Sequence, residues 1–127
     1  MRGKILASSI VVIMTIFFAG IAQSSEVKEI NSGELQEMMN KETKMTIVDI
    51  RASGAFNKGH IPGAVNMPYF NAEEQTQKEL GSDETIVLVC YGGVMSLDLA
   101  KVLKKNGYTD VYSLSGGMGG WNGATVK

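Results

Sequence analysis

The sequence of 127 residues contains one cysteine, one histidine, one tryptophan and two prolines. A single cysteine excludes an intramolecular disulfide, and a single histidine leaves no cluster of histidines and cysteines of the kind that holds a metal ion. No block of like charge is present, and 12 basic against 13 acidic side chains give a net charge of −1. This balance gives no sign of a nucleic-acid-binding surface. We therefore expect no metal, no cofactor and no nucleic-acid partner.

The first two dozen residues differ in composition from the rest of the chain. Two basic residues precede a nearly uncharged stretch, residues 5–22, and polar residues follow it. A short positive start, an apolar middle and small residues near the cut are typical of a secretory signal peptide. The sequence therefore predicts a signal peptide at residues 1–22, with cleavage after Ala22 or, as a second choice, after Ser24.

An uncleaved membrane anchor is the alternative for this segment, because about 18 apolar residues are enough to span a bilayer. Cleavage predicts a periplasmic or secreted protein, and an intact segment predicts a membrane-anchored protein that faces the periplasm. Contact with a membrane is expected only in the second case. The remaining residues, 26–127, suffice for one compact domain, which we expect to be a monomer.

Runs of β-branched residues alternate with helix-like amphipathic segments along residues 26–127. The strand-like runs are short and almost wholly apolar, as is typical of parallel strands buried on both faces. Their alternation with helices predicts an α/β fold, a parallel sheet with helices on both faces. The expected strands are 27–30, 45–50, 64–66, 85–90 and 110–114, and the expected helices are 32–39, 71–80 and 96–106, with a short helical turn at 53–56.

The single thiol, Cys90, lies between the strongest strand-like run and a loop that contains Gly92 and Gly93. Glycines accept backbone angles that let several N–H groups converge on one point, and the positive end of the following helix adds to the attraction for an anion. A sulfur at that point would have a lowered pKa, which favours the nucleophilic thiolate, and Ser96 is placed to donate a hydrogen bond. On these residues alone, an inert buried cysteine and an intermolecular pairing site stay open.

Three motifs distributed along the chain resemble the rhodanese-like domain family of single-domain sulfurtransferases, over essentially all of residues 27–123. In chain order they are VDIRASGAFNKGHIPGAVNMP, CYGGVMSLDLAKVLKKNGYTDVYSLSGG and SGGMGGW. The resemblance implies a rhodanese-like fold, a five-stranded parallel sheet flanked by helices. It also implies that Cys90 is the nucleophile, which accepts a sulfane sulfur as a persulfide and passes it to an acceptor. The implied backbone cradle for its charge consists of Tyr91, Gly92, Gly93, Val94, Met95 and Ser96.

Three further residues, Asp49, Arg51 and His60, are expected to support the site. Asp49 and Arg51 end a strand, where an ion pair or a hydrogen-bonded brace would order the long loop that follows. This is similar to the family's use of these positions, and a substrate contact through Arg51 is the alternative. His60 is a candidate base for Cys90, but its flanking glycines and the resemblance favour a structural turn.

Met95 departs from the family pattern, in which many active members carry arginine at this position of the loop. A guanidinium would bind the anionic sulfonate of thiosulfate through two hydrogen bonds and add positive charge beside the thiolate, and methionine can do neither. We therefore expect poor use of thiosulfate and a preference for less highly charged donors, such as polysulfides or low-molecular-weight persulfides. Cysteine-dependent phosphatases of related fold need an arginine where this chain has Ser96, which argues against phosphatase or arsenate reductase activity.

The leading hypothesis is an exported rhodanese-like sulfurtransferase that works through a Cys90 persulfide. Its partners would be a small sulfur donor and a thiol, a cyanide-like acceptor or a protein sulfur acceptor. The alternative is a non-catalytic rhodanese-like module that binds a protein partner or a sulfur species, with Met95 marking relaxed turnover. A third hypothesis, a redox thiol that forms mixed disulfides, is weakened because the chain holds no resolving cysteine.

Overall fold

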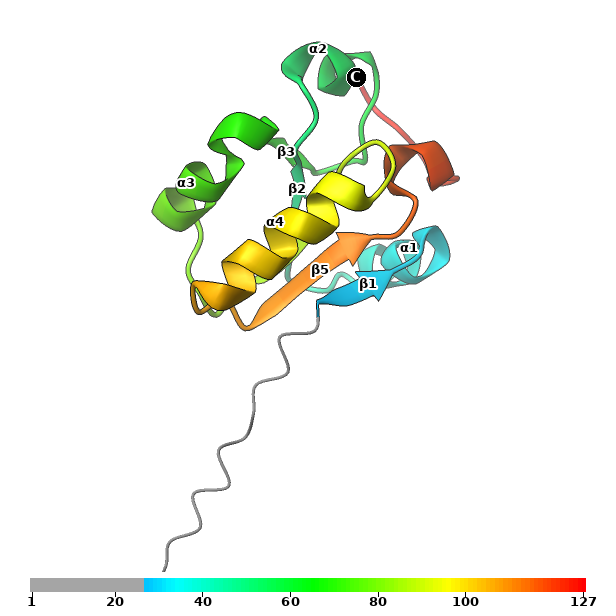
Figure 1. The fold of residues 1–127 in the computed structure, drawn as a ribbon. Helices are drawn as coiled ribbons and strands as arrows, with labels where there is room; N and C mark the ends of the chain where they lie inside the picture. Colours follow the sequence, from blue (N-terminus) through cyan, green and yellow to red (C-terminus); the bar gives the residue numbers. More distant parts are fainter. Residues whose placement is uncertain (1–26) are drawn as a thin grey trace, which may run out of the picture.

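Five short strands form one sheet in the computed structural model, which describes residues 27–127 (Figure 1). The strand order is β1-β5-β4-β2-β3, and the four neighbouring pairs all run parallel. The predicted five-stranded parallel sheet is confirmed. The predicted export segment lies outside the described residues. The strands are β1 (Lys28–Ile30), β2 (Thr46–Asp49), β3 (Val65–Asn66), β4 (Thr85–Val89) and β5 (Asp110–Leu114).

Helices cover both faces of the sheet, as the alternating pattern predicts. Helix α1 (Ser32–Asn40) packs on one face, and α3 (Tyr69–Glu79) and α4 (Val94–Lys105) pack on the other. The short helix α2 (Ser53–Lys58) lies beyond the ends to which the strand arrows point, and the closing turn forms a 3-10 helix, η1 (Gly117–Gly120) (Figure 1). Within residues 27–127, no helix has the length and apolarity needed to cross a membrane.

Alternation along β4 decides which way the single thiol points. Ile86 and Leu88 belong to the apolar cluster under α3 and α4, and Val87 and Val89 belong to the cluster under α1. Successive side chains of a strand point to opposite faces. Cys90 follows β4 directly and continues the first set, so its side chain lies on the α3 and α4 face.

The helix starts differ from the sequence prediction at two places. Helix α4 begins at Val94, two residues before the expected start at Ser96, because Gly93 caps it with a backbone φ of 94° and has no side chain that would signal a cap. Helix α3 begins at Tyr69, directly after Pro68, also two residues before the expected start. In both cases the predicted loop was too long.

The closing turn packs directly against the backbone of the Cys90 loop. The amide of Met118 donates a hydrogen bond to the carbonyl oxygen of Cys90 over 2.8 Å, and the amide of Gly119 donates to that of Tyr91 over 2.9 Å. Gly117 has a φ of 53°, and a Cβ at this position would overlap both of these carbonyl groups. Glycine is therefore required for the close approach that fixes the loop.

We expect Gly117→Ala to displace the Cys90 loop and to lower the free energy of unfolding by about 2–4 kcal/mol, because the methyl group overlaps hydrogen-bonded backbone and the positive φ adds strain. Urea unfolding followed by circular dichroism measures this loss. Gly54→Ala is the matched control, since a Cβ at Gly54 meets nothing within 4 Å. Equal stability of the two variants would contradict the role given to Gly117.

Candidate active site

Cys90 directly follows β4, and α4 begins shortly after it at Val94. Its side chain is nearly buried, with the residue 5% exposed. The amide of Gly93 donates a hydrogen bond to Cys90 Sγ over 3.0 Å, and Ser96 Oγ lies 3.3 Å from the same sulfur. The N-terminal end of α4, which carries partial positive charge, adds to this environment. The loop therefore surrounds the sulfur with groups that favour negative charge.

Two opposing effects act on the pKa of the Cys90 thiol. Burial raises the pKa, because it disfavours the charged form. Hydrogen bonds from the Ser96 hydroxyl and from the backbone amides of Ser96, Gly93 and Gly92 lower it, and together they outweigh burial, so the pKa lies below its ordinary value of 9.0. Because the thiolate is the nucleophilic form, this environment favours a reactive thiol over an inert buried cysteine.

Three other members of the predicted cradle, Tyr91, Val94 and Met95, make no hydrogen bond to Cys90 Sγ among the contacts of residues 27–127. The carbonyl of Tyr91 is held by Gly119 of the closing turn instead. The side chains of Tyr91 and Val94 are exposed, and Met95 is 45% exposed. Their part in holding the charge of a persulfide stays a prediction.

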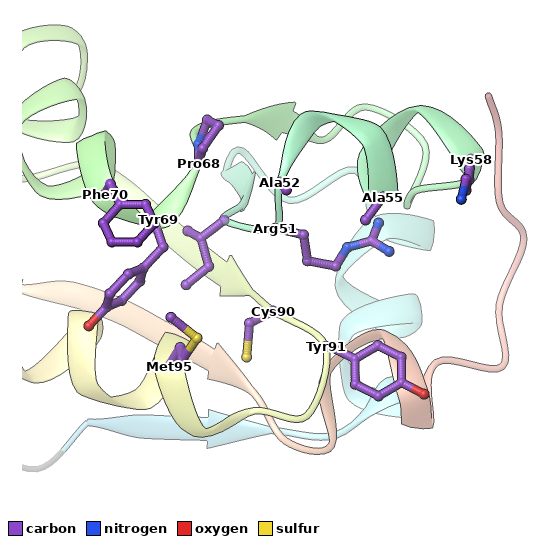
Figure 2. A pocket seen from close by; sticks show the side chains of 11 residues that line it. Arg51, Ala52, Ala55, Lys58, Pro68, Tyr69, Phe70, Cys90, Tyr91 and Met95 are labelled. Carbon is purple, nitrogen blue, oxygen red and sulfur yellow. The ribbon is translucent and has the colours of Figure 1, made fainter.

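A mostly apolar pocket of about 530 Å³ opens over the thiol (Figure 2). Figure 2 shows the Cys90 side chain between aromatic residues near α3 and basic residues near α2. Phe70, at the aromatic end, is 96% exposed. The pocket has room for an organic group beside the sulfur. The lining residues are Ile50, Arg51, Ala52, Ala55, Lys58, Pro68, Tyr69, Phe70, Cys90, Tyr91 and Met95.

Asp49 and Arg51 form an ion pair beside this pocket, with Arg51 Nη2 2.8 Å from Asp49 Oδ2. Asp49 is buried, and the same Nη2 also donates to the carbonyl of Gly59 over 2.8 Å. Asn66 Nδ2 donates to the backbone carbonyls of Asp49 and Arg51. These contacts tie the long loop back to the end of β2 and support the predicted brace. Arg51 also lines the pocket, so a substrate contact stays its alternative role.

His60 makes its contacts with helix α2 and with the C-terminal segment. Its ring stacks on Phe56 with centroids 3.7 Å apart and an interplanar angle of 7°, and Nδ1 lies 2.9 Å from the carbonyl oxygen of Phe56. Its backbone pairs with Val126 in an antiparallel bridge. His60 is not among the residues that line the Cys90 pocket. These contacts support the structural interpretation and argue against a role as base.

Several residues of the site do not follow from the sequence alone, among them Ser113, Tyr69 and Phe70. Ser113 is fully buried on β5, and its Oγ lies 2.8 Å from Ser96 Oγ. The available signal was its place two residues after Val111, on the face of the strand that packs under α4, because buried polar groups need partners. Tyr69 and Phe70 lie between the expected strand 64–66 and the expected helix 71–80, and two adjacent aromatic residues in a polar segment could have indicated a surface contact. Within residues 27–127, no group of three or more His, Cys, Asp or Glu could hold a metal ion.

Comparison with known proteins gives consistent matches over this domain. Residues 31–124 match the family model of the rhodanese-like domain. The thiosulfate sulfurtransferase GlpE of Shewanella oneidensis is 39% identical over 103 residues, which cover 80% of this chain and 99% of that protein. GlpE of Pseudoalteromonas translucida is 37% identical over 98 residues, which cover 76% of this chain and 90% of that protein. The solved rhodanese-like domain of the Anabaena protein Alr3790 has a TM-score of 0.73 at 25% identity and covers 80% of each chain.

Removing the Ser96 hydroxyl should raise the pKa of Cys90, because the largest of the effects that lower it is lost. We expect Ser96→Ala to slow alkylation by iodoacetamide at pH 7 by roughly threefold to tenfold, since a smaller thiolate fraction is partly offset by a more basic sulfur. Alkylation rates across pH 5–10 measure the shift. The exposed Ser82 provides the control variant Ser82→Ala. An unchanged profile in Ser96→Ala would show that the hydroxyl does not stabilise the thiolate.

Proposed function

The chain belongs to the rhodanese-like domain family, and from that premise we propose that it is a sulfurtransferase that carries sulfane sulfur as a persulfide on Cys90. The observation that carries the proposal is the Cys90 thiol itself. Hydrogen bonds from Ser96 and from loop amides lower the pKa of this thiol. The thiol also lines a pocket that can receive a donor. The two relatives named as thiosulfate sulfurtransferases support sulfur transfer as the reaction class.

The proposed reaction has two displacement steps on sulfur. In loading, the Cys90 thiolate attacks the sulfane sulfur of the donor, a new S–S bond forms at Sγ, and the donor's own bond to that sulfur breaks, so the donor residue leaves with the electron pair. In discharge, a thiolate or cyanide attacks the outer sulfur, and the Cys90 thiolate leaves. A thiol of lower pKa is a better leaving group, so the same hydrogen bonds assist discharge.

The walls of the pocket favour a donor of low charge. Thiosulfate carries two negative charges, and apolar walls cannot replace the water that it would lose on binding. Of the two basic residues in the lining, Arg51 is already paired with Asp49 and Gly59, and Lys58 is exposed to solvent. Met95 stands where a guanidinium would help. The exposed ring of Phe70 and the apolar lining offer contact to a carbon skeleton. We therefore propose organic persulfides or polysulfides as the donors.

We further propose, from the composition of residues 1–22, that this reaction takes place outside the cytoplasm. The domain would be periplasmic or secreted after cleavage, or anchored to the membrane if the segment stays in place. The intact mass of the protein recovered from the periplasmic and membrane fractions separates cleavage after Ala22, cleavage after Ser24 and an uncleaved anchor.

A non-catalytic binding module is the second candidate, and the exposed apolar side chains near the loop favour it. Phe70, Tyr91 and Val94 are large, exposed and close in sequence or space to the Cys90 pocket. Exposed apolar groups of this kind often mark a contact with a partner protein. In this case the Cys90 thiol would bind a sulfur species or nothing at all, and turnover would be absent.

Loading of the domain separates the two candidates. We expect an organic persulfide to add one sulfur atom to Cys90, detected by intact mass, at a rate at least about tenfold above that with thiosulfate, because only thiosulfate must place a dianion against apolar walls. Transfer of the sulfur to cyanide or to a thiol is then measured. Cys90→Ser is the control and should load no sulfur. If no donor loads the wild-type protein, sulfur transfer is rejected, and binding without turnover takes its place as the proposed function.

Met95→Arg should raise the use of thiosulfate selectively. The guanidinium adds a two-pronged anion contact near the thiol, so we expect kcat/KM for thiosulfate to rise by about tenfold, the effect of one charged hydrogen-bonding partner. The value for an organic persulfide should change little. Met95→Leu keeps an apolar side chain of similar size and is the matched control. An equal change for both donors would contradict the role given to Met95.

A further inference from the structure

A chain of three side chains leads from strand β5 to the reactive sulfur. Ser113 Oγ lies 2.8 Å from Ser96 Oγ, and Ser96 Oγ lies 3.3 Å from Cys90 Sγ. Both serines are fully buried. Ser113 pairs with Leu88 of β4, two residues before Cys90, and this register brings a hydroxyl of β5 under the first turn of α4. The mechanism proposed above uses Ser96 and leaves Ser113 without a role.

Ser96 has one hydroxyl proton and two acceptors that compete for it. With a protonated thiol, Ser96 donates to the carbonyl of Gly93 over 3.2 Å and accepts from the Cys90 S–H group. When Cys90 ionises, its sulfur can only accept, so the proton of Ser96 must turn toward it. The Gly93 carbonyl keeps a partner in that state, because the amide of Leu97 donates to it over 3.3 Å.

Ser113 forms a hydrogen bond to Ser96 that can persist while the Ser96 proton turns from Gly93 to Cys90. Among the contacts of residues 27–127, Ser96 Oγ is the one hydrogen-bond partner of the Ser113 hydroxyl, and either oxygen could donate in this pair. When the single proton of Ser96 points to Gly93 or to Cys90, Ser113 is the donor. A hydroxyl that accepts a hydrogen bond becomes a stronger donor, and both serines are fully buried, so bulk water does not compete for this bond. The bond also restricts the direction in which the Ser96 proton can point.

We propose that Ser113 is a positioning residue whose hydroxyl keeps Ser96 turned so that its proton reaches the Cys90 sulfur in the thiolate and persulfide states. Ser113 touches neither the sulfur nor the pocket and acts through Ser96 alone. The part that concerns the thiolate does not depend on sulfur transfer. The part that concerns the persulfide rests on the proposed function.

The test is the pH profile of alkylation by iodoacetamide in the full-length protein. We expect Ser113→Ala to move the midpoint to higher pH and to slow alkylation at pH 7 by about threefold, because Ser96 becomes a weaker and less directed donor. Ser113→Thr keeps a hydroxyl and should keep the wild-type profile. The other titratable side chains that line the pocket, Arg51, Lys58, Tyr69 and Tyr91, are unchanged in these variants.

Two comparisons separate positioning from a merely structural role. Ser32 is a buried serine of α1 on the other face of the sheet, and its hydroxyl forms hydrogen bonds with Asn122 and Gln36, so Ser32→Ala removes buried hydroxyl contacts far from Cys90. It should lower stability and leave the alkylation profile unchanged. The double variant Ser96→Ala with Ser113→Ala should show the same profile as Ser96→Ala alone, because Ser113 acts through Ser96. Additive shifts, or an unchanged profile in Ser113→Ala, would overturn the proposal.

Sulfur loading is scored separately on the same proteins by intact mass. If the wild-type protein takes no sulfur from an organic persulfide while Ser113→Ala still moves the alkylation profile, sulfur transfer is wrong and the role of Ser113 toward the thiolate stands. If loading occurs, the persulfide on Ser113→Ala should pass its sulfur to cyanide more slowly than in the wild type, because Cys90 has become a poorer leaving group. An unchanged transfer rate would overturn the persulfide part.

Discussion

The hydrogen bonds from the closing turn to the carbonyls of Cys90 and Tyr91 are the constraint on which the site depends. A peptide group is planar and trans, so a carbonyl held in one direction fixes the following N–H in the opposite direction. Because Gly119 holds the carbonyl of Tyr91, the amide of Gly92 is turned away from the closing turn, and this amide is one of those that lower the pKa of Cys90. The absence of a side chain at Gly117 lets the two segments approach. Backbone packing thus orients the loop amides around the sulfur, while the Ser96 hydroxyl supplies the largest of the effects that lower its pKa.

The sheet and its helices could be predicted because their signals are local. Apolar β-branched runs between turn residues mark the strands, and they reappear in the structure within one or two residues. Cys90 and its glycine loop were also readable, since the sulfur, Gly93 and Ser96 lie within one short stretch. Ser113 could not be found in this way, because parallel pairing of β5 with β4 brings it to the site from a distant part of the chain. The early start of α4 was missed for another reason, since Gly93 caps it through its backbone angle.

Neutral donors and a guanidinium would stabilise the thiolate with different consequences for selectivity. Hydrogen bonds from amides and from Ser96 act at the sulfur itself, over distances of about 3 Å. An arginine at position 95 would act on the sulfur and also on any anion that enters the pocket. In the proposed function, Met95 in that place would separate the reactivity of Cys90 from affinity for anionic donors. The domain would then hold a reactive thiol and discriminate against thiosulfate.

For the proposed sulfur transfer, access to the sulfur would restrict the acceptor as well as the donor. Cys90 is 5% exposed and is reached through the pocket, whose mouth carries the exposed ring of Phe70. A flat protein surface that packs on this mouth would leave the sulfur out of reach. In the proposed function, an acceptor thiol of a partner protein would therefore project into the pocket, from a chain end or a protruding loop, while its flanking residues contact the apolar rim. Small thiols would meet no such restriction, so the depth of Cys90 would select acceptors by shape, and Met95 would select donors by charge.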